Sequence, residues 1–295
     1  MIQPRFAVRA SWFLVLTLYG LLSLFPFFWA LLVSLAPLTA VPPGGTEAVG
    51  VDIMKWPPGI DLFQGTVFGA PATLRNFIEI FQAVPNLLLW LGNTIVFALA
   101  VASGVLFFNT LAAYAFARLK FPLRDFWFAV LLASMMVPFP VTMIPVYNLL
   151  VGMDWVNTYQ GLIIPKLINV SILFFMRQFF LEFPKSLEEA AYMDGASLPR
   201  IVFRVVLPNS RPAIAAQLIY VILGAWNEFM WPLIVTSRQE MYTLTLGLAF
   251  FKGTFFTYWQ YMMAASLLVT IPMIVVFLVF RRQFVESQIA SSIKG

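Results

Sequence analysis

The sequence contains no cysteine and no histidine, and it has few charged residues for its length. The first absence excludes disulfides, thiolate metal sites and thiol nucleophiles. The second excludes imidazole ligands, histidine bases and histidine proton relays. Charged residues make up 11% of the chain and apolar residues 61%, whereas a soluble domain has about 25% and about 45–50%. Because no soluble fold could bury this surplus, part of the apolar surface faces lipid, and the chain is an integral membrane protein.

Six apolar stretches are each long enough to cross a bilayer as a helix, which takes roughly 20 residues. They are Ser11–Ala36, Asn86–Ala117, Phe126–Val151, Gly161–Leu181, Pro212–Thr236 and Thr257–Phe280. The first follows two arginines, as in a signal peptide, but it is longer than the roughly 7–15 residues of a signal peptide's apolar region and is expected to stay as an anchor. We therefore predict an all-α, polytopic protein whose six transmembrane helices form a single domain over residues 1–295.

Basic residues alternate between the segments that join these stretches, and they predict the orientation of the chain. Four segments are rich in them: Arg5 and Arg9; Arg118, Lys120 and Arg124; Lys185, Arg200, Arg204 and Arg211; and Arg281, Arg282 and Lys294. Cytoplasmic loops carry such an excess, so both termini are expected in the cytoplasm. The net charge of +5 is then a topology signal spread over four segments, and we expect no nucleic-acid partner.

Two long connecting segments differ in character. Residues 37–85 are rich in proline and glycine and form the predicted external loop. Residues 183–210 form the predicted cytoplasmic loop, and they contain an unusual run of acids and alanines, EEAAYMDGAS, at positions 188–197.

Local patterns in this cytoplasmic loop predict two short helices. Ser186 and Glu189 have the spacing of a capping box, in which each side chain bonds the other residue's backbone N–H. Glu188 and Glu189 fall in the first turn, where the helix dipole favours acids. Gly195 is suited to the left-handed conformation that closes many helices.

The second helix of the loop should begin at Ser197 as its cap, with Pro199 in the first turn, where the missing N–H costs nothing. Leu207-Pro208 is expected to end it. Two readings of this pair of helices are open from local chemistry alone: an amphipathic loop that only connects two spans, or a docking surface for another protein.

The stretch EAAYMDGASLPRIVFRVVLP, from Glu189 to Pro208, resembles the EAA signature of ABC-importer permeases. The positions in register are Glu189, Ala190, Ala191, Gly195, Val205, Leu207 and Pro208. This resemblance implies that the loop is a coupling helix that docks into a groove on a cytoplasmic ATPase. The residues expected to carry that coupling are Glu189, Ala190, Ala191, Asp194, Gly195, Ala196, Phe203 and Pro208.

Further segments are similar to the carbohydrate branch of these permeases, which includes the maltose system. They are NTLAAYAFARLKF (109–121), MIPVYNLL (143–150), RQFFLEFPKSLEEAA (177–191), AWNEFMWPLIV (225–235) and the terminal IKG (293–295). The resemblance implies a permease subunit that moves a sugar or oligosaccharide across the cytoplasmic (inner) membrane of a prokaryote. Which sugar it moves is left open.

The same resemblance implies the partners. They are a second permease subunit (a different chain or a second copy), two ATPase subunits and an extracytoplasmic solute-binding protein, besides the lipid bilayer. ATP and Mg²⁺ would be bound by the ATPase, so we expect no cofactor, no metal site and no catalytic residue in this chain.

The chain departs from the family pattern at three places. The family usually has an aromatic residue eight positions beyond the aspartate, where this chain has Val202 followed by Phe203. FPLRD stands near residues 121–125 where FPGRD is more usual, and the C-terminal tail lacks a glycine-rich stretch. The first and third departures bear on the details of ATPase contact.

Polar residues inside apolar spans predict the substrate pathway, because they are costly in lipid and usually face the protein interior. Glu228 is the clearest acid within a span, and it could instead pair with a basic residue of a partner subunit. The predicted pathway residues are Tyr147, Asn148, Trp226, Asn227 and Glu228, with Trp231 as another sugar-facing aromatic. The remaining asparagines, such as Asn93 and Asn109, are interpreted first as interhelical hydrogen-bonding residues.

Three prolines within VPFPVTMIP (137–145) predict a broken or kinked third span, because each removes a backbone hydrogen bond. Such a break persists in a membrane where protein or a cavity satisfies the freed groups.

A proton-coupled secondary transporter of a small polar solute is the alternative function, in which Glu228 would carry the proton. Six spans and the EAA spacing favour the importer.

Overall fold

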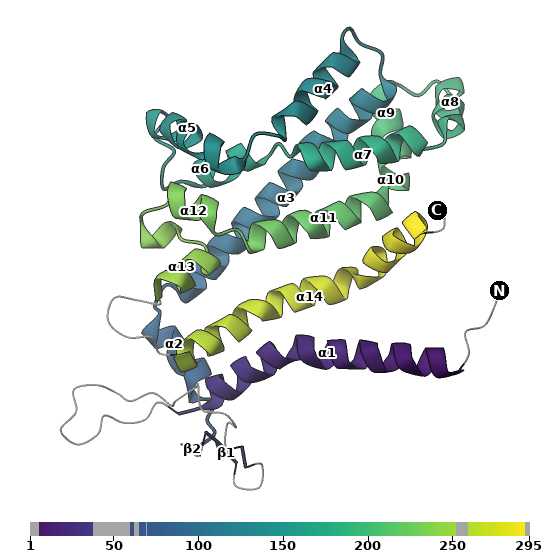
Figure 1. Cartoon of the computed structure of the whole chain (residues 1–295). Helices are drawn as coiled ribbons and strands as arrows, with labels where there is room; N and C mark the ends of the chain where they lie inside the picture. The colour runs from purple at the N-terminus through teal and green to yellow at the C-terminus, as the bar shows by residue number, and fades with distance from the viewer. Residues whose placement is uncertain (1–5, 38–59, 62–64, 69, 252–258, 293–295) are drawn as a thin grey trace. The chain divides into compact units, whose positions relative to one another are not determined.

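The computed structural model describes residues 6–37, 60–61, 65–68, 70–251 and 259–292, and helices predominate among them (Figure 1). Much of the predicted external loop, the N-terminal Arg5 and the terminal IKG lie outside these residues. The helices before the cytoplasmic loop are α1 (Phe6–Leu35), α2 (Arg75–Ala83), α3 (Leu87–Arg118), α4 (Arg124–Ser134), α5 (Phe139–Gly152), α6 (Tyr159–Ile163), the 3-10 turn η1 (Ile164–Lys166) and α7 (Val170–Glu182). They are followed by α8 (Lys185–Met193), α9 (Leu198–Ile201), the π-helical turn η2 (Val202–Val206), α10 (Leu207–Asn209), α11 (Arg211–Trp226), α12 (Met230–Val235), the 3-10 turn η3 (Gln239–Met241), α13 (Leu244–Phe251) and α14 (Trp259–Ser292).

The prediction of an all-α chain is wrong in one detail, since a small hairpin lies within the predicted external loop. Strands β1 (Thr66–Val67) and β2 (Ala70–Pro71) pair antiparallel, with Thr66 opposite Pro71 and Val67 opposite Ala70. A two-residue strand carries too little periodic pattern to be recognised in a sequence.

Three helices of the described chain are long and apolar enough to cross a membrane singly: Ser11–Leu35, Leu87–Arg118 and Trp259–Val279. Three pairs of helices meet the same test only together, each bent at a short break. They are Arg124–Ser134 with Phe139–Gly152 (98°), Tyr159–Lys166 with Val170–Glu182 (41°), and Leu198–Asn209 with Arg211–Trp226 (76°). The protein therefore has three to six candidate spans.

Three of the predicted spans are broken where their sequences contain prolines or polar residues, and one of them, Gly161–Leu181, bends by 41° between Lys166 and Val170. The break predicted at the prolines of 137–145 is present, since α4 and α5 diverge by 98° there. The predicted span Pro212–Thr236 is also interrupted: α11 ends at Trp226 and α12 begins at Met230, leaving Asn227 and Glu228 between them. These breaks leave backbone polar groups that other parts of the chain must satisfy.

The chain forms two compact units, residues 1–87 with 248–272 and residues 88–247 with 273–295. In the first unit, α2 is attached to the end of α1 by a buried asparagine. The Asn76 side chain donates hydrogen bonds to the carbonyls of Ser34 (2.7 Å) and Ala36 (2.8 Å). It thereby satisfies carbonyls that the last turn of a helix leaves unpaired.

In the second unit, α7 and α11 run side by side (Figure 1), and asparagines of α3 join distant segments. Asn109 donates to the carbonyl of Leu167 (2.8 Å) and accepts from the backbone N–H of Asn169 (3.0 Å), across the break between α6 and α7. Asn93 donates to the carbonyls of Glu240 (2.7 Å) and Tyr242 (2.9 Å). The interpretation of these two residues as interhelical hydrogen-bonding residues is confirmed.

Candidate functional site

The predicted coupling loop contains a tight glycine corner between α8 and α9. Gly195 has a φ of +75°, as predicted for the residue that closes the first helix. Its N–H donates to the carbonyl of Tyr192 (3.0 Å), and the N–H of Ala196 donates to the carbonyl of Ala191 (3.0 Å). This is the hydrogen-bond pattern of a Schellman motif, in which a glycine without a Cβ accepts the left-handed conformation. The two backbone hydrogen bonds and the left-handed glycine therefore define the conformation of this corner.

The predicted capping box at the start of α8 is wrong. The helix begins at Lys185 after Pro184, and no side chain caps it. Ser186 is thus already inside the first turn, where its hydroxyl cannot bond the N–H of Glu189 in the capping manner. The neighbouring acid, Glu188, contacts residues of α3 instead.

Glu188 links α8 to the end of α3 through a buried group of polar side chains. Its carboxylate lies 3.0 Å from Nε of Arg118 and accepts a hydrogen bond from the hydroxyl of Tyr114 at 2.9 Å. The side chains of Arg118 and Glu188 are only 7% and 10% exposed. Arg118 also donates to the carbonyl of Phe183 just before α8. The contact between Nε and the carboxylate is an ion pair outside hydrogen-bond geometry.

The second helix of the loop begins after Ser197, as predicted, with Pro199 in its first turn, although the Ser197 side chain makes no capping bond. The prediction that Leu207-Pro208 end it is wrong: the helical run continues through the π turn η2 and α10 to Asn209. Pro208 follows the π turn η2, and the helical run ends one residue later, at Asn209.

The two sides of this helical run differ in exposure. Ile201 and Val206 are fully buried and Val202 is nearly so, whereas Phe203 is 52% exposed. The one-residue offset from the family pattern therefore places valine inward and the aromatic outward. Of the predicted coupling residues, five are exposed (Glu189, Ala190, Asp194, Gly195 and Phe203) and three are half-buried (Ala191, Ala196 and Pro208).

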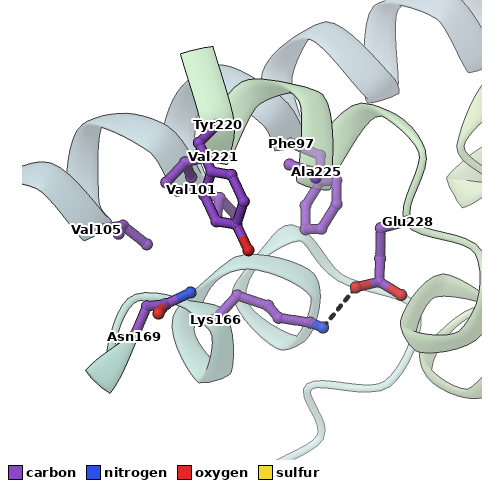
Figure 2. Close-up of a pocket in the computed structure, with 10 residues that line it drawn as sticks. Phe97, Val101, Val105, Lys166, Asn169, Tyr220, Val221, Ala225 and Glu228 are labelled. Atoms are coloured by element: carbon purple, nitrogen blue, oxygen red, sulfur yellow. Dashed lines mark hydrogen bonds and ion pairs between the residues drawn. The ribbon is translucent and has the colours of Figure 1, made fainter. Parts of the chain in front are cut away.

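A cavity of about 200 Å³ lies in the second unit, between α3, α11 and the break before α7 (Figure 2). Its wall is mostly apolar, and its polar groups are few. The lining residues are Phe97, Val101, Val105, Lys166, Asn169, Tyr220, Val221, Gly224, Ala225 and Glu228. A concave apolar site with a few convergent polar groups is the usual form of a small-molecule site.

An ion pair between two helix breaks forms the charged part of this cavity. Nζ of Lys166, at the end of η1, lies 2.7 Å from Oε2 of Glu228, which stands between α11 and α12 (Figure 2). Glu228 also accepts from the backbone N–H of Trp231 at 3.3 Å. The ammonium lies 4.7 Å from the ring centre of Phe139 and 5.6 Å from that of Trp231, within the range of a cation–π contact.

The predicted pathway residues do not all meet at this cavity. Glu228 lines it, whereas Trp226 is buried beside it and Asn227 is exposed, with its side chain donating to the carbonyl of Leu223. Tyr147 and Asn148, on α5, do not line this cavity. Trp231 is buried, and its indole donates to the carbonyl of Leu162 (3.0 Å).

Two residues of these sites were not predicted from the sequence: Lys166, which lines the cavity, and Arg118, which was expected only as a topology signal. Lys166 could have been noticed as a charge after a proline in an apolar stretch, IPKLINV, since charges there are costly and usually functional. The Arg118–Glu188 pair has no signal in the sequence, because its members are 70 residues apart in chain position and only the packing of α3 and α8 joins them. Among the described residues, no group of three or more acids is placed to hold a metal ion.

Comparison with known proteins decides the family. The sequence profile of the binding-protein-dependent transport system inner membrane component matches residues 109–287. The chain belongs to this family. It is thus a multi-pass membrane transport component. The residues of the glycine corner and the cavity-lining residues from Lys166 to Glu228 lie within the matched region, whereas Phe97, Val101 and Val105 precede it.

Relatives in this family match most or all of the chain. The arabinooligosaccharides transport system permease protein AraQ of Bacillus subtilis is 32% identical over 294 residues, which cover 99% of each chain. AraQ of Halalkalibacterium halodurans is 34% identical over 76% of this chain and 80% of its own. The sn-glycerol-3-phosphate transport system permease protein UgpE of Pectobacterium atrosepticum is 35% identical over 69% and 73%.

A solved structure has the same fold. It is the crystal structure of a bacterial ABC transporter involved in the import of the acidic polysaccharide alginate, with a TM-score of 0.75 and 20% identity. The likeness covers 96% of this chain and 99% of the other.

Proposed function

We propose that this chain is the permease subunit of an ABC importer that moves a sugar or oligosaccharide inward across the cytoplasmic membrane. The observation that carries the proposal is the match to AraQ of Bacillus subtilis over 99% of both chains. The name of that relative supports an arabinose-containing oligosaccharide as the substrate class. The exposed glycine corner supports the same function, because an exposed turn between two helices offers a docking surface.

The proposed topology has six spans within a single permease domain of residues 1–295. Three single helices, the bent pairs α4–α5 and α6–α7, and α11 with α12 are available for these spans, and the basic residues of the connecting segments support cytoplasmic termini. In this arrangement residues 183–210 lie in the cytoplasm and residues 37–85 outside.

The coupling loop is proposed to dock on a separate ATPase, which binds ATP and Mg²⁺ and performs the hydrolysis. A second permease subunit, a second ATPase and an external solute-binding protein complete the importer, as the family description implies for a binding-protein-dependent system. Movement of α8 would reach the membrane helices through the buried Arg118–Glu188 contact, because this contact ties α8 to α3.

The rival function is a secondary transporter driven by protons through Glu228. The ion pair with Lys166 argues against it, because the Glu228 carboxylate already has a cation at 2.7 Å and a backbone donor.

Uptake into proteoliposomes distinguishes these functions. The chain is reconstituted with its partner permease and ATPase subunits, and entry of labelled arabinotriose is measured with the solute-binding protein outside. Uptake that requires both enclosed ATP and the binding protein is the expected result. Uptake that persists without ATP and follows an imposed proton gradient would overturn the proposal.

A further inference from the structure

The Lys166–Glu228 pair is only partly exposed, and each of its two charges has further partners besides the other charge. Both side chains are 25% exposed, and pairs this accessible contribute at most about 1 kcal/mol to stability. Yet each charge has additional partners: two aromatic rings for the ammonium, and the backbone N–H of Trp231 for the carboxylate. Two charges placed within apolar stretches are costly, so a role other than folding accounts better for them.

The geometry of the pair suits a sugar. An ammonium has three donors and a carboxylate about four acceptor positions, so both groups keep hydrogen-bonding capacity beyond their mutual contact. A donor and an acceptor 2.7 Å apart match two neighbouring hydroxyls, one accepting from Lys166 and the other donating to Glu228. Hydrogen bonds to charged groups are the stronger kind.

The rest of the cavity suits the apolar face of a sugar ring. Phe97, Val101 and Val221 supply an apolar wall, and Figure 2 shows the Tyr220 hydroxyl directed toward the segment that carries Lys166 and Asn169. At about 200 Å³ the cavity is smaller than the roughly 300–1,000 Å³ of drug-sized sites. It therefore accommodates one sugar unit of a chain at a time.

The charge of the cavity decides which sugars it accepts. Its lining contains one ammonium, that of Lys166, and one carboxylate, that of Glu228. A carboxylate or phosphate on the substrate would be attracted by Lys166 and repelled by Glu228 at nearly the same distance. An uncharged sugar meets no such opposition.

We infer that the Lys166–Glu228 pair is a specificity determinant that recognises vicinal hydroxyls of an uncharged sugar unit and rejects anionic sugars. This inference rests on the proposed importer function. A single neutralisation should change the selectivity: Glu228→Gln leaves an unopposed ammonium, and Lys166→Met leaves an unopposed carboxylate.

The test compares binding of two matched probes to the assembled importer in lipid nanodiscs without nucleotide. The probes are arabinobiose and its anionic oxidation product arabinobionate, and their dissociation constants are measured by calorimetry. The wild type is expected to favour arabinobiose. Glu228→Gln should weaken arabinobiose binding and shift the ratio of the two constants toward arabinobionate by about tenfold or more, the effect of losing one charge-assisted hydrogen bond.

Two further variants separate charge from misfolding. The exchanged double variant Lys166→Glu/Glu228→Lys keeps the cavity neutral and should restore the preference for arabinobiose. Glu240→Gln removes an exposed acid that does not line the cavity and should leave the ratio at the wild-type value.

Two results would overturn the inference: a wild type that prefers arabinobionate, or a ratio in Glu228→Gln within twofold of the wild type. Uptake driven by ATP is measured on the same preparations. If the wild type imports sugar and the ratio does not move, this inference alone fails, whereas loss of ATP-driven uptake in the wild type means that the proposed function fails.

Discussion

The guanidinium of Arg118, at the end of α3, lies 3.0 Å from the buried carboxylate of Glu188 in α8. The pair fixes α8 to the end of α3, so the proposed coupling loop is attached to this long helix. The hydroxyl of Tyr114 donates a hydrogen bond to the same carboxylate. Because the side chains of Arg118 and Glu188 are both buried, the loss of either charge should weaken this attachment.

Glu188→Gln should lower the free energy of unfolding by about 3–5 kcal/mol, because it leaves the Arg118 charge buried without a counter-charge. The thermal unfolding midpoint of the purified protein measures this loss. The double variant Arg118→Met/Glu188→Leu should recover most of it, since a well-packed apolar pair often replaces a buried ion pair without cost. Glu189→Gln, at the exposed neighbouring acid, is the control, and an equal loss there would contradict the prediction.

Substitution of Gly195 should uncouple ATP hydrolysis from uptake, least for asparagine, more for alanine and most for valine. The φ of +75° costs a residue with a Cβ about 1–2 kcal/mol, asparagine tolerates it best, and a β-branched residue worst. The corner would relax and misplace the loop while the protein still inserts in the membrane. ATPase and uptake rates of the assembled importer are the measurements, and normal uptake by Gly195→Val would disprove the coupling role.

Gly161→Ala should destabilise the protein by about 1–3 kcal/mol, the usual cost of overpacking. A Cβ at this position would lie 2.2 Å from the carbonyl oxygen of Trp155, and a backbone atom cannot move aside as a flexible side chain can. Gly92→Ala, where a Cβ meets nothing within 4 Å, is the matched control. Comparable unfolding midpoints for the two variants would show that the close approach to Trp155 does not affect stability.

The absence of cysteine from the chain allows the proposed topology to be tested without background labelling. Met193→Cys, at a side chain that is 89% exposed, should react with a membrane-impermeant maleimide only after the cells are opened. Leu74→Cys, where the side chain is 68% exposed, should react in intact cells. Val33→Cys replaces a fully buried side chain and should react in neither. Labelling of Met193→Cys from outside would reverse the proposed orientation.

Several elements of the fold could be read from local patterns. The apolar stretches predicted the long helices, the prolines at 137–145 predicted the break between α4 and α5, and Gly195 predicted the corner after α8. Each of these signals acts through the residue's own backbone or its immediate neighbours, so no distant partner is needed.

Errors arose where a distant residue competed with a local signal. Ser186 and Glu189 have the right spacing for a capping box, but α8 begins at Lys185, next to Phe183, whose carbonyl is held by Arg118. A second error is local: the helical run is expected to end at Leu207-Pro208, but it continues through the π turn η2 to Asn209.

The sequence by itself determined that the chain is a membrane protein, roughly where its long apolar helices lie, and through a spaced motif which family it resembles. Composition and periodicity suffice for this because lipid demands apolar side chains and satisfied backbones. Only the tertiary structure paired Arg118 with Glu188 and Lys166 with Glu228. The energy of an ion pair depends on the distance and burial of two charges, and residues far apart in the chain acquire both only when the helices pack.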